Sequence, residues 1–494
     1  MRKLTWKILF ASFMFISIMT GCSPVDPPVN ESDTNDTTSS PIESETEKPA
    51  DKTDEASFNG VTLDENSRLI PTAYDRVQTF ENGKTPIKEI YVGLDGNDVS
   101  GDGTKTAPYK TFAKAVALAE PGTSILIKPG KYDSLFIAKN LHGTEENPIW
   151  IGGIPGEEMP VLSSPSGSVL IERGSYIIIH DIEVTGAEVH GVHVNDGGDL
   201  ADFEAAHHFV FRNIYNHNIG DSCFKFAGVN YTWLFDCDVS YSHMAGRASA
   251  AIDSVGCHYN TVAYNYIHDV TAIGVGFKGG SYEGDIYGNL FVNTGASAIN
   301  MGQSTGDAFF RPPLEKNYTM YEAHDIRTYS NVFVKCENSF AFISSTNCYA
   351  VNNTVILPVD HIFRILNNDD TDSKKLANKA SPHNSVIANN IFYYDTTVRD
   401  PLNVGGGTDP KSFTFQNNIL YFINNPSEMP WNYANNFTAE NTITLNPLLN
   451  ENYAPQSDSP AIAAGVEGDF PFVTVDFNGK PFNNPRSIGA VEFD

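Results

Sequence analysis

A short segment of alternating polar and apolar residues with a central asparagine recurs along the chain. Examples are TVAYNYIHD, DIYGNLFVN, RTYSNVFVK, YAVNNTVIL and VIANNIFYY. The shortest gaps between successive central residues fall in the low to middle twenties. Self-similarity at this period is typical of a solenoid, and the longer gaps then contain loop insertions. The central residues, called anchors below, are Asp181, Asn213, Cys237, Asn265, Asn289, Asn331, Asn353, Asn390 and Asn418.

The repeated segments predict strands, because they alternate β-branched and aromatic residues with polar ones. A second short strand follows each anchor, as in GVHVND, CFKFAG, GVGFKG and SAINMG. Two or three strands per coil, stacked in register, predict an all-β fold, a right-handed parallel β-helix. An anchor asparagine suits a turn between strands. It tolerates the left-handed conformation, and its amide can bond the asparagine of the next coil in a ladder.

One segment before the coils has a helical pattern. It is YKTFAKAVALAEPG, residues 109–122, and Pro121-Gly122 ends it. We expect this amphipathic helix to cap the N-terminal end of the β-helix, where an uncovered strand edge would otherwise invite aggregation.

The start of the chain indicates export. A basic start and an apolar run from Ile8 to Met19 predict a signal peptide over residues 1–22. The small residues before Cys22 resemble a bacterial lipobox, which implies cleavage before Cys22 and a lipid anchor on it. An ordinary secretory signal is the alternative. We therefore expect an extracytoplasmic protein, lipid-anchored to the bacterial membrane or cell surface.

Composition divides the rest of the chain and limits its partners. Residues 23–58 are rich in Ser, Thr, Pro, Asp and Glu and predict a disordered acidic tether. Residues 59–90 form a lead-in, and residues 91–494 form the β-helix domain.

The formal net charge of -28 argues against nucleic acid as a partner. An acidic polysaccharide would need a local basic patch or a bound cation. We expect a monomer.

The two ends of the domain resemble a known superfamily. YVGLDGNDVSGDGTKTAPYKTFAKAVALAEPGTSILIKPGKY begins at Tyr91, and SDSPAIAAGVEGDFPFVTVDFNGKPFNNPRSIGAVEF ends at Phe493. They resemble the opening and closing segments of secreted parallel β-helix proteins of the pectate-lyase-like superfamily. This resemblance implies the fold and points toward polysaccharide lyases, although one fold hosts many functions.

The alternation of strand side chains predicts which residues face outward. Val275 and Phe277 fill the core, so Gly276 and Lys278 face out. Small residues between long polar ones predict a groove for an extended polymer, with Asp253 beside Lys278. A solvated face with an Asp253–Lys278 ion pair, worth under about 1 kcal/mol, is the alternative. The first expected outward column is His193, Lys225, Ala251, Gly276, Asn300, Ala341 and Arg364, and the second is Asn195, Ala227, Asp253, Lys278 and Gly302.

Long insertions flank this expected groove. MGQSTGDAFFRPPLEKNYTMYEAHD follows the Asn300 strand and carries Arg311 and Tyr318. Long loops on a rigid solenoid usually carry binding residues. Aromatic rings such as Tyr318 could stack on sugars, and Arg311 could bind a carboxylate through two parallel hydrogen bonds.

The resemblance suggests β-elimination on a uronic-acid polysaccharide. That reaction needs a base near the C5 proton and a cation at the carboxylate. By resemblance, Lys278 would be the base, and Arg311 or a calcium ion at Asp253 would neutralise the carboxylate. Asp238 is either a turn residue or a second calcium ligand. Calcium remains an open expectation, because no aspartate cluster precedes Lys278 by one coil. The expected sugar-binding residues are Lys225, Asn300, Arg364, His193 and Tyr318.

Two other functions remain open. A non-catalytic, glycan-binding lipoprotein of the cell surface would share every feature except a working base. A glycoside hydrolase would need paired carboxylates. Asp221, Asp253 and Asp269 are the acids near the expected groove, and they form no adjacent pair on its strands.

Overall fold

The computed structural model describes residues 62–64, 66–73, 76–242, 250–315, 319–368, 378–426, 437–468 and 470–493. All of them belong to one compact unit, Asp54–Asp494. The predicted signal peptide with Cys22, the predicted tether and Tyr318 lie outside the described residues. Within the described ranges, no helix has the length and apolar character needed to cross a membrane.

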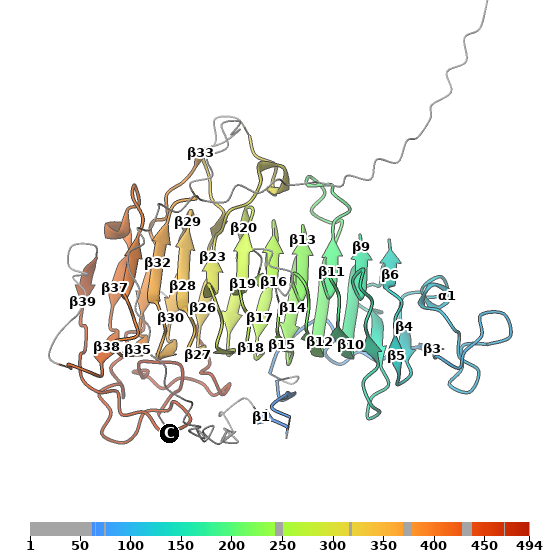
Figure 1. Cartoon of the computed structure of the whole chain (residues 1–494), viewed down its shortest axis with the longest axis horizontal. Coiled ribbons are helices and arrows are strands. Elements are labelled where there is room, and N and C mark those ends of the chain that lie inside the picture. Colours follow the sequence, from blue (N-terminus) through green and yellow to red (C-terminus); the bar gives the residue numbers. More distant parts are fainter. Residues whose placement is uncertain are drawn as a thin grey trace, which may run out of the picture. The chain divides into compact units, whose positions relative to one another are not determined.

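The chain winds into a parallel β-helix, in which each coil adds one strand to each of up to three sheets (Figure 1). The first sheet has ten parallel strands, which are β6 (Phe136–Lys139), β9 (Val169–Glu172), β11 (Val192–Asn195), β13 (Phe224–Ala227), β16 (Ala250–Val255), β19 (Ile273–Lys278), β23 (Ser297–Met301), β28 (Asn338–Ile343), β32 (His361–Leu366) and β36 (Leu402–Val404).

The other two sheets share the long strands β10 (Ser175–Thr185) and β12 (His207–His217). The second sheet also contains β3 (Lys88–Val92), β4 (Thr123–Ile127), β7 (Ile149–Gly153), β14 (Asn230–Phe235), β17 (Thr261–Ala263), β21 (Asp285–Tyr287), β26 (Arg327–Tyr329), β30 (Tyr349–Val351), β34 (Val386–Ala388), β37 (Thr414–Gln416) and β39 (Thr438–Glu440). The third also contains β5 (Lys131–Tyr132), β8 (Val161–Leu162), β15 (Asp238–Ser240), β18 (Tyr266–His268), β22 (Leu290–Val292), β27 (Val332–Val334), β31 (Thr354–Ile356), β35 (Ile391–Tyr394) and β38 (Ile419–Phe422).

Short elements lie in the connections between these strands. They are β20 (Ser281–Tyr282), β25 (Ala323–His324) and β29 (Ser345–Thr346), the pair β24 (Thr319–Met320) and β33 (Asn378–Lys379), the antiparallel pair β1 (Thr62–Leu63) and β2 (Leu69–Ile70), and the 3-10 turns η1 (Asp307–Phe309) and η2 (Pro410–Ser412).

The core runs along the inside of the coils. Alternate residues of the first sheet point inward and are buried, such as Val275 and Phe277 in β19. Aromatic residues stack from coil to coil, as do Phe291 and Phe333 with ring centroids 4.9 Å apart. Five cysteines are free and fully buried, which agrees with their interpretation as small apolar residues. They are Cys223, Cys237, Cys257, Cys336 and Cys348.

The predicted asparagine ladder is confirmed from Asn265 onward. The Asn265 amide nitrogen donates to Asn289 Oδ1 at 2.9 Å, and Asn289 repeats this contact to Asn331 at 3.0 Å. The contact continues through Asn353 and Asn390 to Asn418. The left-handed residue comes directly before each anchor in this part of the chain, as at Tyr264, Ser330 and Asn352. At Asp181 and Asn213 the anchor itself is left-handed.

The predicted helix is present in a shorter form. α1 spans Phe112–Val116, and the Thr111 hydroxyl caps its first turn by accepting from the Lys114 N–H. Phe112 is buried against Tyr132 and Phe136, with ring centroids 5.4 Å apart in both pairs. The helix ends early because the chain turns after Ala117, before the predicted Pro121-Gly122 stop. Its role as a cap stays a prediction.

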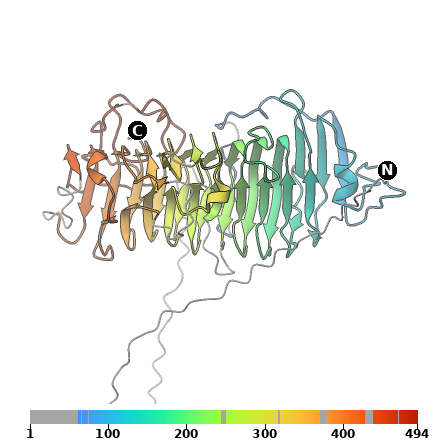
Figure 2. The ribbon, with the colours of Figure 1, turned by 90° about the horizontal axis from the view of Figure 1, so that it is seen from above.

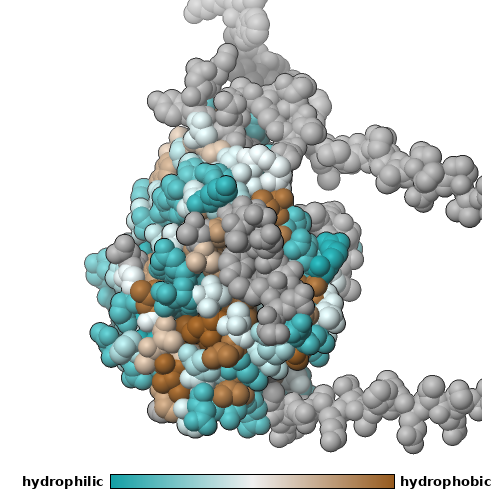
Figure 3. Space-filling view, turned by 90° about the vertical axis from the view of Figure 1, so that its left-hand side faces the viewer, coloured by the Kyte–Doolittle hydropathy of each residue, from teal (hydrophilic) through white to brown (hydrophobic). Residues whose placement is uncertain are grey.

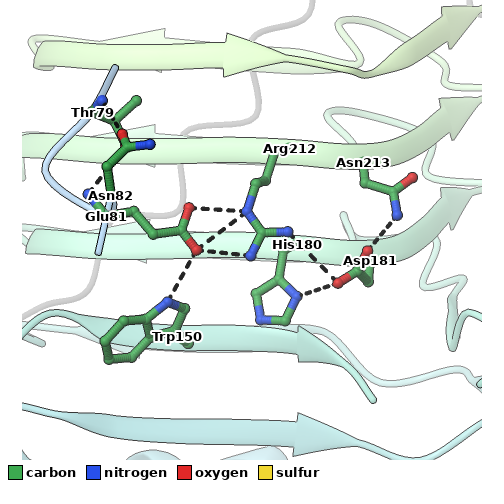
Figure 4. A network of polar contacts seen from close by, with 8 residues as sticks. All are labelled: Thr79, Glu81, Asn82, Trp150, His180, Asp181, Arg212 and Asn213. Carbon is green, nitrogen blue, oxygen red and sulfur yellow. Dashed lines mark hydrogen bonds and ion pairs between the residues drawn. The ribbon is translucent and has the colours of Figure 1, made fainter. Parts of the chain in front are cut away.

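The lead-in binds the coils through a buried acid, Glu81 (Figure 4). The Glu81 carboxylate accepts from both Nε and Nη2 of Arg212, at 2.9 and 2.8 Å, and from Trp150 Nε1 at 3.1 Å. Trp150 belongs to β7 and Arg212 to β12. A bidentate pair of this kind is geometrically demanding, so it fixes the lead-in at one position along the solenoid.

The lead-in and the C-terminal segment meet on one side of the solenoid (Figure 2). Asp236 accepts from the backbone N–H of Ala73, and Asp238 accepts from that of Leu69. Arg76 Nη1 donates to the Asn478 carbonyl at 2.8 Å, and its guanidinium lies 4.3 Å above the ring of Tyr264. Segments 402 residues apart are therefore joined over the middle coils.

The surface at the β39 end of the solenoid shows hydrophobic residues between hydrophilic ones (Figure 3). Leu445 and Leu448, which follow β39 in the chain, are 64% and 37% exposed. Scattered exposure of this kind is normal for a protein surface.

Candidate functional site

The first sheet carries two outward columns, and the observed register corrects the predicted one at β16. Lys225 pairs with Asp253 and Ala227 with Val255, so Asp253 lies two positions from where it was expected. The first column is thus His193, Lys225, Asp253, Gly276, Asn300, Ala341 and Arg364, and the second is Asn195, Ala227, Val255 and Lys278.

The misplacement has a physical reason. A shift of two residues leaves the same faces inward and outward, so hydrophobic alternation does not distinguish the two registers. The predicted register placed Ala250 and Ile252 in the core. The observed register places Ile252 and Ser254 there, beside Phe224 and Phe226. A buried serine at a core position gave no signal in the sequence.

Two lysines share one buried carboxylate at the centre of the columns. Lys225 Nζ lies 2.5 Å from Asp253 Oδ2, and Lys278 Nζ lies 3.1 Å from Asp253 Oδ1. The Asp253 side chain is 1% exposed, against 19% for Lys225 and 10% for Lys278. Burial alone would raise the pKa of Asp253, but the two ammonium charges outweigh it and hold that pKa below its usual value. The group carries one net positive charge.

A pocket of about 580 Å³ opens above these lysines. It is bounded by the outward residues of β11, β13, β16 and β19 and by parts of two insertions. The first insertion is residues 196–206, between β11 and β12, and the second is residues 302–315, after β23. Its polar lining includes His190, His193, Asp196, Lys225 and Lys278, and its apolar lining includes Leu200, Ala227, Val255, Ala308 and Phe309.

Arg311 joins the two insertions through buried contacts, and it is not among the lining residues of the pocket. Its guanidinium is fully buried and donates to Asn230 Oδ1 at 2.9 Å, to the Gly256 carbonyl at 3.1 Å and to the Asp202 carbonyl at 3.2 Å. It also lies 4.2 Å from the ring centroid of Phe203. The predicted role of Arg311 in binding a substrate carboxylate does not fit this position, because the side chain is 0% exposed and its Nη1 and Nη2 groups donate to protein atoms.

Glu322 is a second buried charge beside the pocket, and sequence reasoning missed it. Its carboxylate accepts from the N–H of Gly279, which follows Lys278, and from the N–H of Thr305, which lines the pocket, each at 3.0 Å. Asn368 donates to it at 2.6 Å. A lone glutamate in an insertion carries no sequence signal for this role. His190, Asp196 and Val255 were missed as well, because none lies in the expected columns.

His193 is neutral at ordinary pH. Burial, with the nearby His190 and the Lys225 charge, lowers the pKa of His193 to about 4. It is the direct register neighbour of Lys225, so their two strands lie about 5 Å apart along the solenoid. A neutral imidazole beside an ammonium group can accept a proton.

The other predicted sugar-binding residues are spread more widely. Asn300 and Arg364 continue the first column, but they lie outside the lining of the pocket among the described residues. Asn300 is buried. Tyr318 lies outside the described residues.

The predicted calcium ligands do not fit a calcium site. Asp253 is already held by two ammonium groups. Asp238 lies in β15 on the third sheet, where it accepts from the Leu69 N–H at 2.9 Å and contacts His268 Nε2 at 3.1 Å. In the part of the chain that the structure describes, no group of three His, Cys, Asp or Glu side chains could hold a metal ion.

Comparisons with known proteins agree with this architecture. Residues 90–278 match the family model "Pel9A-like, right handed beta helix region". The crystal structure of pectate lyase Pel9A superposes with a TM-score of 0.50 at 14% identity, covering 83% of this chain and 98% of that one. XylC in complex with xylose gives a TM-score of 0.50 at 10% identity, covering 82% and 98%.

A sequence relative is found in Bacillus subtilis (strain 168). Its uncharacterized protein YwoF is 29% identical over 132 residues. The match spans 26% of this chain and 27% of YwoF, so about a quarter of each protein is compared. Together with the parallel coils, these comparisons establish a right-handed parallel β-helix and confirm the predicted fold class.

Proposed function

We propose that this protein is a polysaccharide lyase that cleaves a uronic-acid-containing polysaccharide by β-elimination in the pocket above Lys225 and Lys278. The observation that carries the proposal is the pair of lysines sharing the buried Asp253 beside the neutral His193. A cationic pair next to a proton acceptor supplies the two functions that this elimination needs. The fold likeness to pectate lyase Pel9A agrees with this class of reaction.

The ion pairs change the role that the sequence suggested for Lys278. A base needs a nitrogen that is free to take a proton, whereas Lys278 Nζ is held in an ion pair with the buried Asp253 carboxylate 3.1 Å away. Lys278 and Lys225 therefore bind and neutralise the uronate carboxylate. His193 removes the C5 proton, and the negative charge that develops on the carboxylate is stabilised by the two ammonium groups.

The elimination balances within the substrate. The electrons of the C5–H bond form the C4–C5 double bond as the C4–oxygen bond breaks. His193 keeps the abstracted proton and later loses it to water, while the leaving oxygen takes up a proton from water. Burial is the main cause that lowers the pKa of His193, and the charges of His190 and Lys225 add to it. The substrate carboxylate offsets the part that comes from Lys225.

A hydrolase receives less support from this pocket. Hydrolysis of a glycoside uses two carboxyl groups that both reach the sugar. Of the carboxyl groups near this pocket, Asp253 is 1% exposed and paired with both lysines, and Asp196 is 3% exposed. Burial raises the pKa of Asp196, which would suit a general acid, but the second carboxyl group, that of Asp253, is held by both lysines.

The test is activity of the purified protein on a panel of uronic-acid polymers, read from the ultraviolet absorbance of the new double bond. We expect Lys278→Ala, Lys225→Ala and His193→Gln each to reduce kcat/KM by about a thousandfold or more. Lys139→Ala is the matched control. Lys139 is an outward lysine of the same sheet that pairs with Glu172 at 3.1 Å, and it is not among the lining residues of the pocket.

Three results would redirect the proposal. Normal activity of His193→Gln with loss in Lys278→Ala would return the role of base to Lys278. New reducing ends without a double bond would indicate hydrolysis. Binding of a polymer without any product would indicate a glycan-binding protein.

We also propose that the protein is exported and anchored through a lipid on Cys22. The support is the sequence before Cys22, which resembles a lipobox. Cys22→Ala should move the protein from the membrane fraction to the soluble extracytoplasmic fraction or leave its signal uncut. Unchanged processing and fractionation would contradict the anchor.

A further inference from the structure

We infer that the protein has a second sugar site, which holds a single neutral sugar ring in a pocket just beyond the C-terminal edge of the first sheet. This inference rests on the proposed function for the class of ligand, a glycan, and it adds a position and a charge. The site lies outside the pocket above the two lysines, and its test does not use cleavage of any polymer.

This second pocket has a volume of about 310 Å³. That volume lies at the lower end of the usual range of about 300–1,000 Å³ for small-ligand sites, so it suits one ring better than a length of polymer. The lining combines the short strands β20 and β25 with parts of both insertions and with the segment that begins at Thr319. It consists of Phe203, Gly280, Tyr282, Pro312, Thr319, Met320, Tyr321 and His324.

The two pockets are neighbours in the chain. Lys278 lines the first pocket and Gly280 lines the second, and two residues of extended chain span no more than about 7 Å. The second insertion contributes to both pockets, because Phe309 lines the first and Pro312 lines the second. The buried Arg311 lies between these two residues in the sequence. The two sites are therefore close enough to bind two units of one glycan.

The lining of the second pocket disfavours a charged ligand. Among the described residues that line it, there is no Asp, Glu, Lys or Arg. Burial raises the pKa of Tyr282 to about 12 and raises that of Tyr321, so both phenols are neutral at ordinary pH. His324 Nδ1 lies 2.6 Å from Asp325 Oδ2, so a positive charge on this imidazole would be balanced by that acid. A uronate carboxylate would lose water here without gaining a free cation.

The rings of the lining suit a pyranose. This sugar ring has a face of C–H groups and a rim of hydroxyl groups, so it needs apolar surface and a few polar groups together. Tyr282 is stacked between His258 and His324, with ring centroids 3.9 and 5.0 Å away, so it offers its edge. Tyr321 is fixed by His383, whose Nε2 lies 3.0 Å from the Tyr321 hydroxyl and whose ring is tilted by 52° against it. We expect the sugar to pack on the ring of Tyr321. A wholly apolar ligand, such as a lipid tail, would leave the polar groups of this lining without partners.

The experiment measures binding of neutral disaccharides to the whole protein by calorimetry. The neutral probes are cellobiose, xylobiose and β-1,4-galactobiose, and digalacturonate is the charged probe. We expect at least one neutral disaccharide to bind with a Kd of about 1 mM, because so small a ligand makes few contacts. Its binding should slow hydrogen exchange in residues 280–282 and 319–321, and digalacturonate should leave exchange there unchanged.

Variants of Tyr321 test whether its ring is the cause. Tyr321→Ala should raise the Kd of the neutral probe by about tenfold or more, whereas Tyr321→Phe keeps the ring and should raise it by no more than about threefold. Tyr421→Ala is the matched control and should leave the Kd unchanged. Tyr421 is also partly buried against one ring, that of Tyr393 at 5.4 Å, and it is not among the lining residues of the second pocket.

The outcomes separate this inference from the proposed function. No binding of any neutral disaccharide, binding that Tyr321→Ala leaves unchanged, or equal protection of residues 319–321 by digalacturonate would overturn the inference. Protection of these residues by N-acetyltryptophanamide alone would also overturn it, since that result would indicate an aromatic peptide as the ligand. Neutral binding without cleavage of any uronic-acid polymer would support the second site and remove the lyase. Cleavage without neutral binding would do the reverse.

Discussion

The asparagine ladder and the first outward column follow the same coils, yet they treat their polar groups in opposite ways. Inside, each ladder amide from Asn265 to Asn390 donates to the next asparagine and to a backbone carbonyl. In and beside the outward column, Asn300 Oδ1, Gln303 Oε1 and Arg364 Nε are buried without a hydrogen-bond partner among the described residues. The ladder amides therefore find their partners within the repeat, whereas these three atoms have none among the described residues.

We expect the asparagine ladder to contribute more to the free energy of unfolding than the outward column does. Asn331→Ala removes the acceptor for two N–H groups of Asn289 and the donor to the Ile286 carbonyl. Because each buried group left unpaired costs roughly 1–3 kcal/mol, we expect the free energy of unfolding to fall by about 4 kcal/mol. Urea denaturation measures it. Asn441→Ala, at an exposed asparagine that contacts Asn417 in the same manner, should cost under about 1 kcal/mol. Equal losses would contradict the comparison.

Substitution of Arg311 tests whether its contacts stabilise the two insertions that border the pocket. Arg311→Ala leaves Asn230 Oδ1 and two backbone carbonyls without their donor and removes the cation above Phe203. We expect a loss of about 3 kcal/mol in unfolding free energy. Hydrogen exchange should also rise in residues 196–206, which lie over a hundred residues from the substitution.

The matched control for Arg311 is Arg399→Ala, because Arg399 pairs with Asp360 on the surface with 71% of its side chain exposed. That variant should leave exchange in residues 196–206 unchanged. If Arg311→Ala also leaves it unchanged, Arg311 does not join the two insertions.

His268 on the third sheet makes a pH-dependent contribution to the free energy of unfolding. Burial alone would lower its pKa, but its contacts with Asp238 and Asp269 raise the pKa of His268 to about 9. Because the folded-state pKa exceeds the unfolded value, the contribution is complete below about pH 6.5 and is lost as pH rises through about 9. We expect roughly 2–3 kcal/mol of unfolding free energy to disappear across this range.

His268→Gln should flatten that pH dependence when unfolding is followed by urea at several pH values. His324→Gln provides the comparison, because the His324 side chain is 37% exposed and contacts a single acid, Asp325. A wild-type stability that stays level from pH 6.5 to 9 would exclude the contribution.

The smallest effect on stability is expected in the outward column itself. Lys278→Ala removes one of the two partners of Asp253 but leaves Lys225 in place. Because Asp253 is buried but keeps Lys225 as a partner, we expect the unfolding free energy to fall by about 1–2 kcal/mol while activity falls steeply. Thermal unfolding and the lyase assay on the same preparation measure both. A loss of stability as large as that of Asn331→Ala would show that the column also serves the fold.

Much of the fold was predictable, because each coil repeats the same pattern of residues. The anchors at Asn265, Asn289 and Asn331 each carry the same neighbours, so coil stacking and the ladder followed from the sequence. The outward position of Lys278 followed from the alternation with Val275 and Phe277. Even the contact between Lys278 and Asp253 was expected, although through a register that the structure corrects.

The site was less predictable, because its decisive features depend on contacts between distant segments. Arg311 was expected to face a ligand, since a sequence does not show that Phe203 and Asp202 contact it in the folded chain. Glu322 gave no signal, because its partners Gly279 and Thr305 are brought to it only by folding. A shift of two residues, as at Asp253, leaves the same residues facing inward and outward. The alternation of polar and apolar residues in the sequence therefore does not reveal it.

The contact between Arg76 and Asn478 has a consequence for how the molecule comes apart. In an open array of repeats, each coil touches only its neighbours, so the end coils can detach one after another while the centre stays folded. Here the segments before the first coil and after the last one are joined across Tyr264, in the middle of the array. The two terminal segments and the coils between them therefore form one continuous set of contacts. Thermal unfolding should then be a single cooperative transition. Proteases should cleave the domain from either end only when the whole domain unfolds.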